Sequence, residues 1–155
     1  MVAHNVEIRR YQDGDGQAVA KNMRDADRRE IMYLTLLRPW PAVRMTVAHA
    51  EGCWTGLADG EIGCIFGINR KTVISDIGVP WLLGTPVMDT VPTRFLRESR
   101  EYYARMERAF PKMENWVMAE NTKAVQWLSW LGFDMGEPIP MGIGGKEYIR
   151  FTKGF

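Results

Sequence analysis

Hydrophobic positions follow two different periods along the chain, and each change of period predicts a boundary between a strand and a helix. Residues 5–12 alternate between apolar and polar types before the turn-forming letters "DGDG", which predicts a first strand that ends in a turn. Over 17–37 apolar residues recur at helical spacing among many charges, which predicts one helix. Pro39 and Pro41 interrupt this pattern, so a second and shorter helix is expected over 42–50.

The stretch "CWTGLADGEIGCIFGI" predicts a hairpin whose strands, 53–58 and 61–68, turn at Asp59-Gly60. A two-residue turn places the two cysteines diagonally on one face, which is a poor geometry for a disulfide, so both are expected to be buried thiols. The same turn fixes the expected register. It pairs Leu57 with Ile62, Thr55 with Cys64 and Cys53 with Phe66, and it puts Trp54 and Ile65 on the opposite face.

The second half of the chain contains further strands and the strongest helical pattern. Residues 72–88 are expected to be extended, with Gly78 and Pro80 breaking the ladder, and 89–110 form an amphipathic helix. A strand is expected at 112–120, a helix at 121–132, and two strands within 137–153 joined at Gly144-Gly145. This order predicts a single mixed α/β domain of the α+β type over 1–155, with a mostly antiparallel twisted sheet and helices on both faces.

Composition and charge narrow the classes of partner. The 155 residues, 46% hydrophobic and 25% charged, suit one globular domain. Twenty Lys and Arg residues nearly balance 19 Asp and Glu residues, and the net charge of +1 gives no electrostatic reason to expect a nucleic acid or a membrane as partner. The amino terminus lacks a continuous apolar segment, so a soluble intracellular protein is expected.

Several familiar motifs are missing from the sequence. The "DGDG" turn has acidic residues at calcium-loop spacing, but the glycine that such a loop needs at its sixth position is Ala18. Walker loops, G-x-S-x-G elbows and H-E-x-x-H motifs do not occur, and neither do the Cys and His spacings of a zinc site. We therefore expect no metal site.

A different signature lies in "ENTKAVQWLSWLGF", where Asn121 is followed three residues later by Ala124 and a helix ends in Leu-Gly-Phe at 131–133. Together with the order of elements, this stretch resembles the GNAT acyltransferase superfamily. The resemblance implies acetyl-CoA or another acyl-CoA as cofactor and an amine, which the sequence does not identify, as acceptor.

A narrower resemblance extends over most of the chain. The segments "RDADRREI", "VPWLLGTPVM", "RFLRESREYY" and "PIPMGIGGKEYIRFTK" are similar to a phage-encoded GNAT-like family that includes the internal virion protein A of T7-like phages. This resemblance implies a phage or prophage source, and a location in the host cytoplasm or in the virion.

The superfamily resemblance also indicates where an acyl-CoA would bind. The pantetheine arm pairs with the backbone edge of the fourth strand, which here is Trp81, Leu82 and Leu83. The pyrophosphate usually sits on a glycine-rich loop before the next helix, but the matching segment "MDTVPTRFL" has no glycine and Pro92 lacks an N–H. The candidates that remain for cofactor contacts are Thr93, Arg94 and Asn121, and the alternative for the first two is an ordinary exposed helix start.

Candidate acid and base residues are also atypical. Many GNAT enzymes have a catalytic Tyr seven residues after the Asn, where this chain has Leu128, and the adjacent Ser129 points about 100° away on a helix. For the general base, the candidates are Asp27 and Glu30 of the first helix and Glu120 at the end of the fifth strand. A plain charged helix surface is the alternative for the first two.

Two hypotheses of function therefore remain. The first is an acyl-CoA-dependent N-acyltransferase, and the second is a catalytically inactive GNAT-fold virion structural or morphogenesis protein, since a fold does not fix a function. Partners would be an amine substrate under the first and phage or host proteins under the second. A homodimer through the carboxy-terminal strands is compatible with both.

Overall fold

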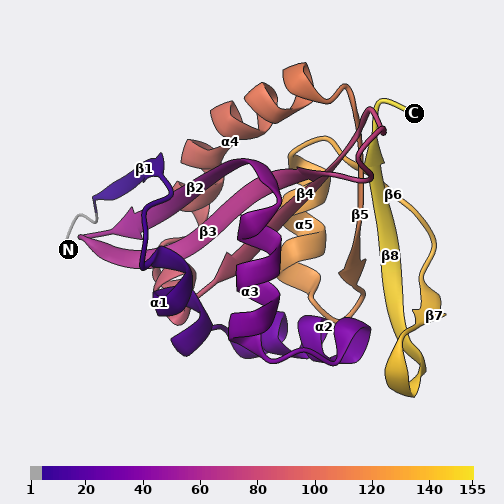
Figure 1. The fold of residues 1–155 in the computed structure, drawn as a ribbon, viewed down its shortest axis with the longest axis horizontal. Coiled ribbons are helices and arrows are strands. Elements are labelled where there is room, and N and C mark those ends of the chain that lie inside the picture. The colour runs from indigo at the N-terminus through magenta and orange to yellow at the C-terminus, as the bar shows by residue number, and fades with distance from the viewer. Residues whose placement is uncertain (1–4) are drawn as a thin grey trace.

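An eight-stranded sheet organises residues 5–155, the part of the chain that the computed structural model describes (Figure 1). Its order is β1-β2-β3-β4-β5-β8-β6, and β7 also pairs with β8. Only β4 and β5 run parallel, so the predicted mostly antiparallel sheet is confirmed. The strands are β1 (Val6–Arg10), β2 (Ala50–Ala58), β3 (Glu61–Arg70), β4 (Ile77–Gly84), β5 (Lys112–Met118), β6 (Asp134–Met135), β7 (Ile139–Met141) and β8 (Lys146–Lys153).

Three helices, α1 (Asp15–Lys21), α2 (Asp25–Thr35) and α3 (Pro39–Ala48), precede β2, where the sequence predicted two. The expected single helix over 17–37 is wrong because Arg24 leaves the helical conformation and its N–H donates to the carbonyl of Gly84, at 2.8 Å, at the end of β4. This tertiary hydrogen bond separates α1 from α2. It also holds the start of α2 against the carboxy-terminal end of β4.

The first face of the sheet is covered by α1 and α3, whose apolar residues pack with β3 and β4. Val19 and Val43 are fully buried there, together with Ile65 of β3. The third helix begins earlier than the predicted 42–50, since a proline is well suited to the first turn, where its missing N–H is not needed.

The second face is covered by α4 (Pro92–Ala109) and α5 (Thr122–Trp130), and it holds the larger core. The predicted apolar face of α4 is confirmed, because Phe95, Tyr103 and Met106 are all buried. Helices thus lie on both faces, as predicted. None of the described helices is both long enough and apolar enough to cross a lipid bilayer.

The hairpin of β2 and β3 turns at Asp59-Gly60, as predicted, and both residues have positive φ angles. Leu57 pairs with Ile62 as expected, but the register beyond that pair is shifted by one residue because Gly63 forms a bulge. A side chain at Gly63 would collide with the ring of Phe95. The predicted pairs of Thr55 with Cys64 and Cys53 with Phe66 are therefore wrong, and the observed pairs are Thr55 with Ile65, Trp54 with Phe66 and Cys53 with Gly67.

The bulge also changes which side chains share a face. Trp54 was expected beside Ile65, but it stacks on Phe66 in the larger core, with ring centroids 5.8 Å apart. Cys53 and Cys64 are free thiols, as expected, but only Cys64 is fully buried and Cys53 is half-buried, so the prediction of two buried thiols is wrong for Cys53. Burial raises the pKa of both to about 12, so neither is a ready nucleophile at neutral pH.

The carboxy-terminal elements follow the prediction with two additions. β7 and β8 are joined through a short 3₁₀ turn, η2 (Ile143–Gly145), that includes the predicted Gly144-Gly145, and the two-residue strand β6 was not predicted. In the predicted extended segment 72–88, only β4 is a strand, and η1 (Pro86–Thr90) is a 3₁₀ turn that leads into α4.

Candidate functional site

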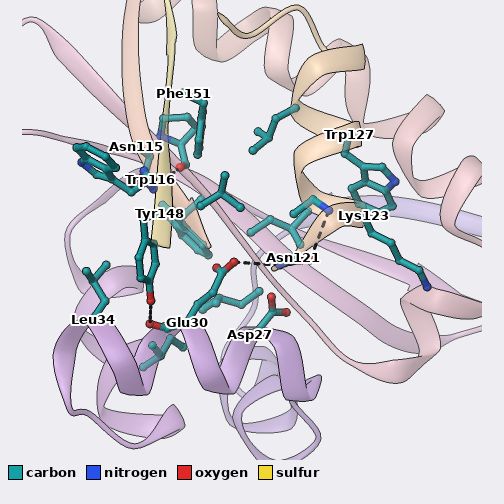
Figure 2. Close-up of a pocket in the computed structure, with 18 of the residues that line it drawn as sticks. Asp27, Glu30, Leu34, Asn115, Trp116, Asn121, Lys123, Trp127, Tyr148 and Phe151 are labelled. Atoms are coloured by element: carbon teal, nitrogen blue, oxygen red, sulfur yellow. Dashed lines mark hydrogen bonds between the residues drawn. The ribbon is translucent and has the colours of Figure 1, made fainter. Parts of the chain in front are cut away.

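A pocket of about 280 Å³ lies where β4 and β5 separate. The two strands share only the pairs of Ile77 with Lys112 and Gly78 with Met113, after which the ladder stops. Pro80 has no N–H to continue it. Residues of α2 line one end of the pocket and residues of α5 line the other (Figure 2).

Asn115 of β5 fixes the place where the strands part. Its amide nitrogen donates to the carbonyl of Pro80 at 2.8 Å, and its amide oxygen accepts from the N–H of Trp116 at 2.8 Å. The Asn115 side chain thus replaces one backbone hydrogen bond between β4 and β5, and it also accepts the hydrogen bond of a backbone N–H of β5. In the sequence this residue is marked only as an amide directly before the apolar run 116–118.

The exposed backbone edge of β4 consists of a single residue, Leu82. The backbone groups of successive residues in a strand point to opposite sides, so those of alternate residues point to the same side. Gly84 donates to a side chain of α2 and the Pro80 carbonyl accepts from β5, so both face away from β3, and Leu82 between them does the same. Leu82 lies opposite Phe66 of β3, but by the same alternation the backbone groups that point to β3 are those of Trp81 and Leu83. Among the described residues, no group pairs with the backbone N–H and C=O of Leu82.

Three tryptophans, Trp81, Trp116 and Trp127, line the pocket. Trp81 lines the pocket, but its Nε1–H donates to Asn69 Oδ1 at 2.7 Å, and the residue packs with the core under α1 and α3. Trp116 forms a wall at the α2 end, near Tyr148 and Leu34 (Figure 2). The predicted cofactor residues 81–83 therefore do line the pocket, and their role in cofactor binding stays a prediction.

Glu30 points from α2 into the pocket at the point where β5 ends (Figure 2). Its Oε1 accepts from the backbone N–H of Met118 at 3.1 Å and from Asn121 Nδ2 at 3.0 Å. Neither donor carries a charge. Burial raises the pKa of the Glu30 carboxyl to about 7, because these two hydrogen bonds offset only part of the cost of removing the charge from water.

Asn121, predicted as a cofactor contact, joins two parts of the site. Its side-chain oxygen accepts from the N–H of Ala124 at 3.4 Å and caps α5, while its nitrogen donates to Glu30. The residue that carries the sequence signature therefore orients the carboxylate as well as starting the helix.

Both carboxylate oxygens of Asp27, one turn before Glu30, accept hydrogen bonds. Its two oxygens accept from Arg24 at 3.1 and 3.2 Å, and Oδ2 also accepts from the N–H of Gly84 at 2.8 Å. The residue is 3% exposed. It ties the start of α2 to the end of β4, which makes it a structural group and not a free base.

The other predicted catalytic residues lie outside the pocket lining. Glu120 is exposed and forms ion pairs with Lys146 at 2.9 Å and Arg29 at 2.8 Å, and the hydrogen bond from Lys146 holds its pKa below the usual range. Ser129 is exposed on α5, whereas its neighbour Leu128 lines the pocket. Of the predicted acid and base residues, Asp27 and Glu30 line the pocket, and only Glu30 is without an ion-pair partner there.

Two tyrosines that the sequence pattern does not single out also line the pocket. Tyr103 of α4 stacks on Phe66, with centroids 5.8 Å apart, and burial raises its pKa. Among the described residues, no group forms a hydrogen bond with its hydroxyl. Tyr148 of β8 donates to the Glu30 carbonyl at 3.1 Å, which fixes α2 against the sheet, and burial raises its pKa to about 12.

The loop before α4 has no glycine cradle. In η1 the N–H of Met88 donates to the carbonyl of Thr85, and Asp89 forms an ion pair with Arg24 at 3.2 Å. The first hydrogen bond of α4 is made by Phe95, so the N–H groups of Thr93 and Arg94 have no partner within the helix. Both residues are exposed and lie outside the pocket lining, and the nearest cation that does line it at the α5 end is Lys123.

The chemistry available in the pocket is that of hydrogen bonds and proton transfer. Glu30 offers a carboxyl that titrates near neutral pH, Leu82 offers a backbone edge, and Tyr103 offers a hydroxyl. Among residues 5–155, no group of three or more His, Cys, Asp or Glu side chains is arranged to hold a metal ion.

No protein-family model matches the chain, and no curated protein sequence matches it significantly. Solved structures match it in fold. An acetyltransferase of the GNAT family from Streptococcus pneumoniae is 15% identical with a TM-score of 0.61, and the match covers 96% of this chain and 98% of that one. A Salmonella typhimurium protein solved with its cofactor acetyl-CoA is 10% identical with a TM-score of 0.66, covering 97% and 95%.

A third structure, spermidine N-acetyltransferase from Vibrio cholerae in complex with CoA and spermine, is 16% identical with a TM-score of 0.64, covering 95% of this chain and 94% of that one. At these identities the likeness establishes the fold. The chain has the GNAT fold, as its sequence resemblance implied, and the narrower phage resemblance stays a prediction.

Proposed function

We propose that this protein is an acyl-CoA-dependent N-acyltransferase. The observation that carries the proposal is the buried carboxyl of Glu30, held by neutral donors at the opening between two parallel strands. The solved structures of the same fold support it, since one contains acetyl-CoA and another contains CoA with spermine.

The residues around the opening fit the arm of an acyl-CoA. The free N–H and C=O of Leu82 suit the amide groups of pantetheine, and the apolar side chains of Leu128 and Leu131 line the wall beside it. For the phosphates the fit is atypical, because η1 offers no glycine cradle. The N–H groups of Thr93 and Arg94 and the guanidinium of Arg94 would hold them, with Lys123 adding charge at the α5 end.

Each chemical role falls to one residue. An acyl-CoA supplies a thioester, whose C–S bond breaks as the C–N bond to the amine forms. Glu30 takes the proton that the amine loses, and a pKa near 7 leaves a large part of it ionised at neutral pH. Tyr103 stays protonated because burial raises its pKa, so it suits a hydrogen-bond donor to the leaving sulfur, and Tyr103→Phe is expected to lower kcat about tenfold.

The experiment that tests the proposal measures cofactor binding by thermal unfolding. Millimolar acetyl-CoA is expected to raise Tm, because a ligand that binds only the folded state stabilises it. Leu82→Pro removes the N–H that faces the opening, leaves the β3 ladder intact, and is expected to weaken binding about tenfold. Arg94→Glu is expected to abolish most of the rise, whereas Arg108→Glu, an exposed residue at the other end of α4, serves as the matched control.

A missing Tm rise with acetyl-CoA and with longer acyl-CoAs would overturn the proposal. So would binding that is unchanged in both Leu82→Pro and Arg94→Glu. A mixture of acetyl-CoA with candidate amines then gives the catalytic readout, the release of free CoA thiol.

The proposal also includes the biological setting that the sequence resemblance implies. It places the protein in a phage-encoded branch of the fold, acting in the host cytoplasm on an amine, and as a homodimer through its carboxy-terminal strands. The alternative is an inactive virion protein that contacts other phage or host proteins. Mass spectrometry of purified virions separates the two, since an abundant packaged copy without acyl-CoA binding would favour the alternative.

A further inference from the structure

The α2 end of the pocket combines the carboxyl of Glu30 with apolar side chains. Leu34, one turn along α2, and the side chains of Trp116 and Tyr148 from β5 and β8 lie together on one side of the Glu30 carboxyl, and Asn121 lies on the other (Figure 2). Tyr148 has already used its hydroxyl to bind the Glu30 carbonyl. It therefore presents its ring, and not a polar group, to whatever approaches the carboxylate.

The charged residues that line the pocket offer one unpaired carboxylate, which can balance the charge of one cation. The charged lining residues are Arg24, Asp27, Glu30 and Lys123. Asp27 is neutralised by Arg24, and Lys123 lies at the α5 end (Figure 2). Glu30 is therefore the one carboxylate of the lining, among the described residues, whose partners are all neutral. A ligand with two or three ammonium groups would leave all but one of them without a counter-charge.

The surface around this end is apolar beyond the pocket itself. Leu34 is 41% exposed and Leu36, which follows the last residue of α2, is 70% exposed. Leu36 has a φ of 63°, a conformation that favours glycine, so this position presents a hydrophobic side chain at some cost in backbone strain. Ile143 of η2 is also exposed, next to Gly142, which packs against the backbone of Tyr33 and Leu34.

We infer that the acceptor is a primary monoamine carried by an apolar body, which places its ammonium at Glu30 and its body against Leu34 and Trp116. This inference rests on the proposed function and specifies its substrate. The same chemistry is found in a free aryl or alkyl amine and in the amino terminus of a polypeptide that begins with a hydrophobic residue. It excludes polyamines such as the spermine bound in the structure from Vibrio cholerae.

The test compares amines in a binding assay and a turnover assay on the full chain. Titration calorimetry in the presence of CoA measures phenethylamine, an amidated peptide with amino-terminal leucine, ethanolamine and spermidine. Release of CoA thiol from acetyl-CoA measures the same four. Phenethylamine or the peptide is expected to bind at least about tenfold more tightly than spermidine and ethanolamine, and the tighter of the two identifies the source of the amine.

Leu34→Asp supplies a second carboxylate at the apolar wall. It is expected to weaken phenethylamine binding about tenfold and to strengthen spermidine binding, while the Tm rise with acetyl-CoA stays unchanged. Ile74→Asp, at a site that is 95% exposed in the connection before β4, is the control and should change neither.

Equal or tighter binding of spermidine by the unmodified protein would overturn the inference, and so would a preference that Leu34→Asp leaves unaltered. Absence of binding by all four amines would also overturn it. These outcomes are separate from a failure of the proposed function, which is the absence of a Tm rise with any acyl-CoA.

Discussion

Two carboxylates on α2, Asp27 and Glu30, line the same pocket one helical turn apart, yet their surroundings differ in one respect. Asp27 is paired with the guanidinium of Arg24 and also accepts from the N–H of Gly84. Glu30 is held only by the amide of Asn121 and the N–H of Met118. The number of hydrogen bonds is similar, but only Asp27 has a cation beside it.

That difference decides what each group can do. Burial raises the pKa of the Asp27 carboxyl as well, but the charge of Arg24 and the hydrogen bonds from Arg24 and Gly84 act against that rise. A buried carboxylate paired in this way is costly to disturb, which suits a structural tie between α2 and β4. A buried carboxylate with neutral partners exchanges its proton near neutral pH, which suits a base. The absence of a cation, and not burial alone, therefore distinguishes the proposed catalytic group from the structural one.

The largest expected effect is on turnover. Glu30→Gln keeps the size of the side chain but removes the base, and we expect kcat/KM to fall by a factor of about 10² to 10⁴. In the unmodified protein the rate should rise with pH up to about 7 and then level, because the ionised carboxylate is the active form. Initial rates between pH 5.5 and 9 measure both effects.

Glu101→Gln, an exposed position on α4, is the matched control for that substitution. If Glu30→Gln transferred acetyl groups as fast as the unmodified protein, with the same pH profile, Glu30 would not be the base.

The second-largest expected effect is a loss of stability when Asp27 is substituted. Asp27→Asn leaves the buried Arg24 without its main counter-charge, and we expect the free energy of unfolding at pH 7 to fall by about 3 kcal/mol. Urea titration followed by far-UV circular dichroism measures it. A change below about 1 kcal/mol, the size expected for an exposed ion pair, would mean that Asp27 is no more structural than a surface group.

The equivalent substitution at Glu30 is expected to raise the free energy of unfolding, whereas at Asp27 it lowers it. The folded pKa of about 7 lies above the usual value of 4.5, so the folded state binds the proton more tightly than the unfolded chain does. Glu30 thus destabilises the fold progressively as pH rises between these values. Glu30→Gln removes this cost, and we expect it to raise stability by roughly 2 kcal/mol at pH 8, with little change at pH 4.5.

Thermal unfolding of both proteins at the two pH values checks this sign. A Glu30→Gln protein that is less stable than the unmodified one at pH 8 would show that the carboxylate is stabilised by its surroundings, as Asp27 is.

The sequence predicted the framework of this site better than its chemistry. Periodicity and turn residues indicated most of the helices and strands and the Asp59-Gly60 turn, because these depend on neighbours along the chain. The bulge at Gly63 depends on the ring of Phe95 from a distant helix. The break between α1 and α2 depends on a hydrogen bond to Gly84. Neither contact leaves a local pattern.

Glu30 illustrates the same limit. Its neighbours Arg28 and Arg29 favoured a charged helix surface, since three charged residues in a row usually face solvent. On the helix, however, successive residues point about 100° apart, so the arginines turn elsewhere. Arg28 donates to the carbonyls of Met23 and Lys21, and Arg29 pairs with Glu120. Only the tertiary structure shows that Glu30 is left without a cation.

The smallest expected effect concerns Glu120, the third acidic residue near the site. Like Asp27 it is paired with cations, Lys146 and Arg29, but like a surface group it is exposed, so solvent and salt screen both pairs. Glu120→Gln is therefore expected to leave both the Tm and the pH profile of turnover unchanged. Rates and unfolding measured beside those of Glu30→Gln check it. If Glu120→Gln lost turnover and Glu30→Gln did not, the base would be Glu120, a carboxylate that is paired with two cations. The presence or absence of a cationic partner would then not identify the functional carboxylate.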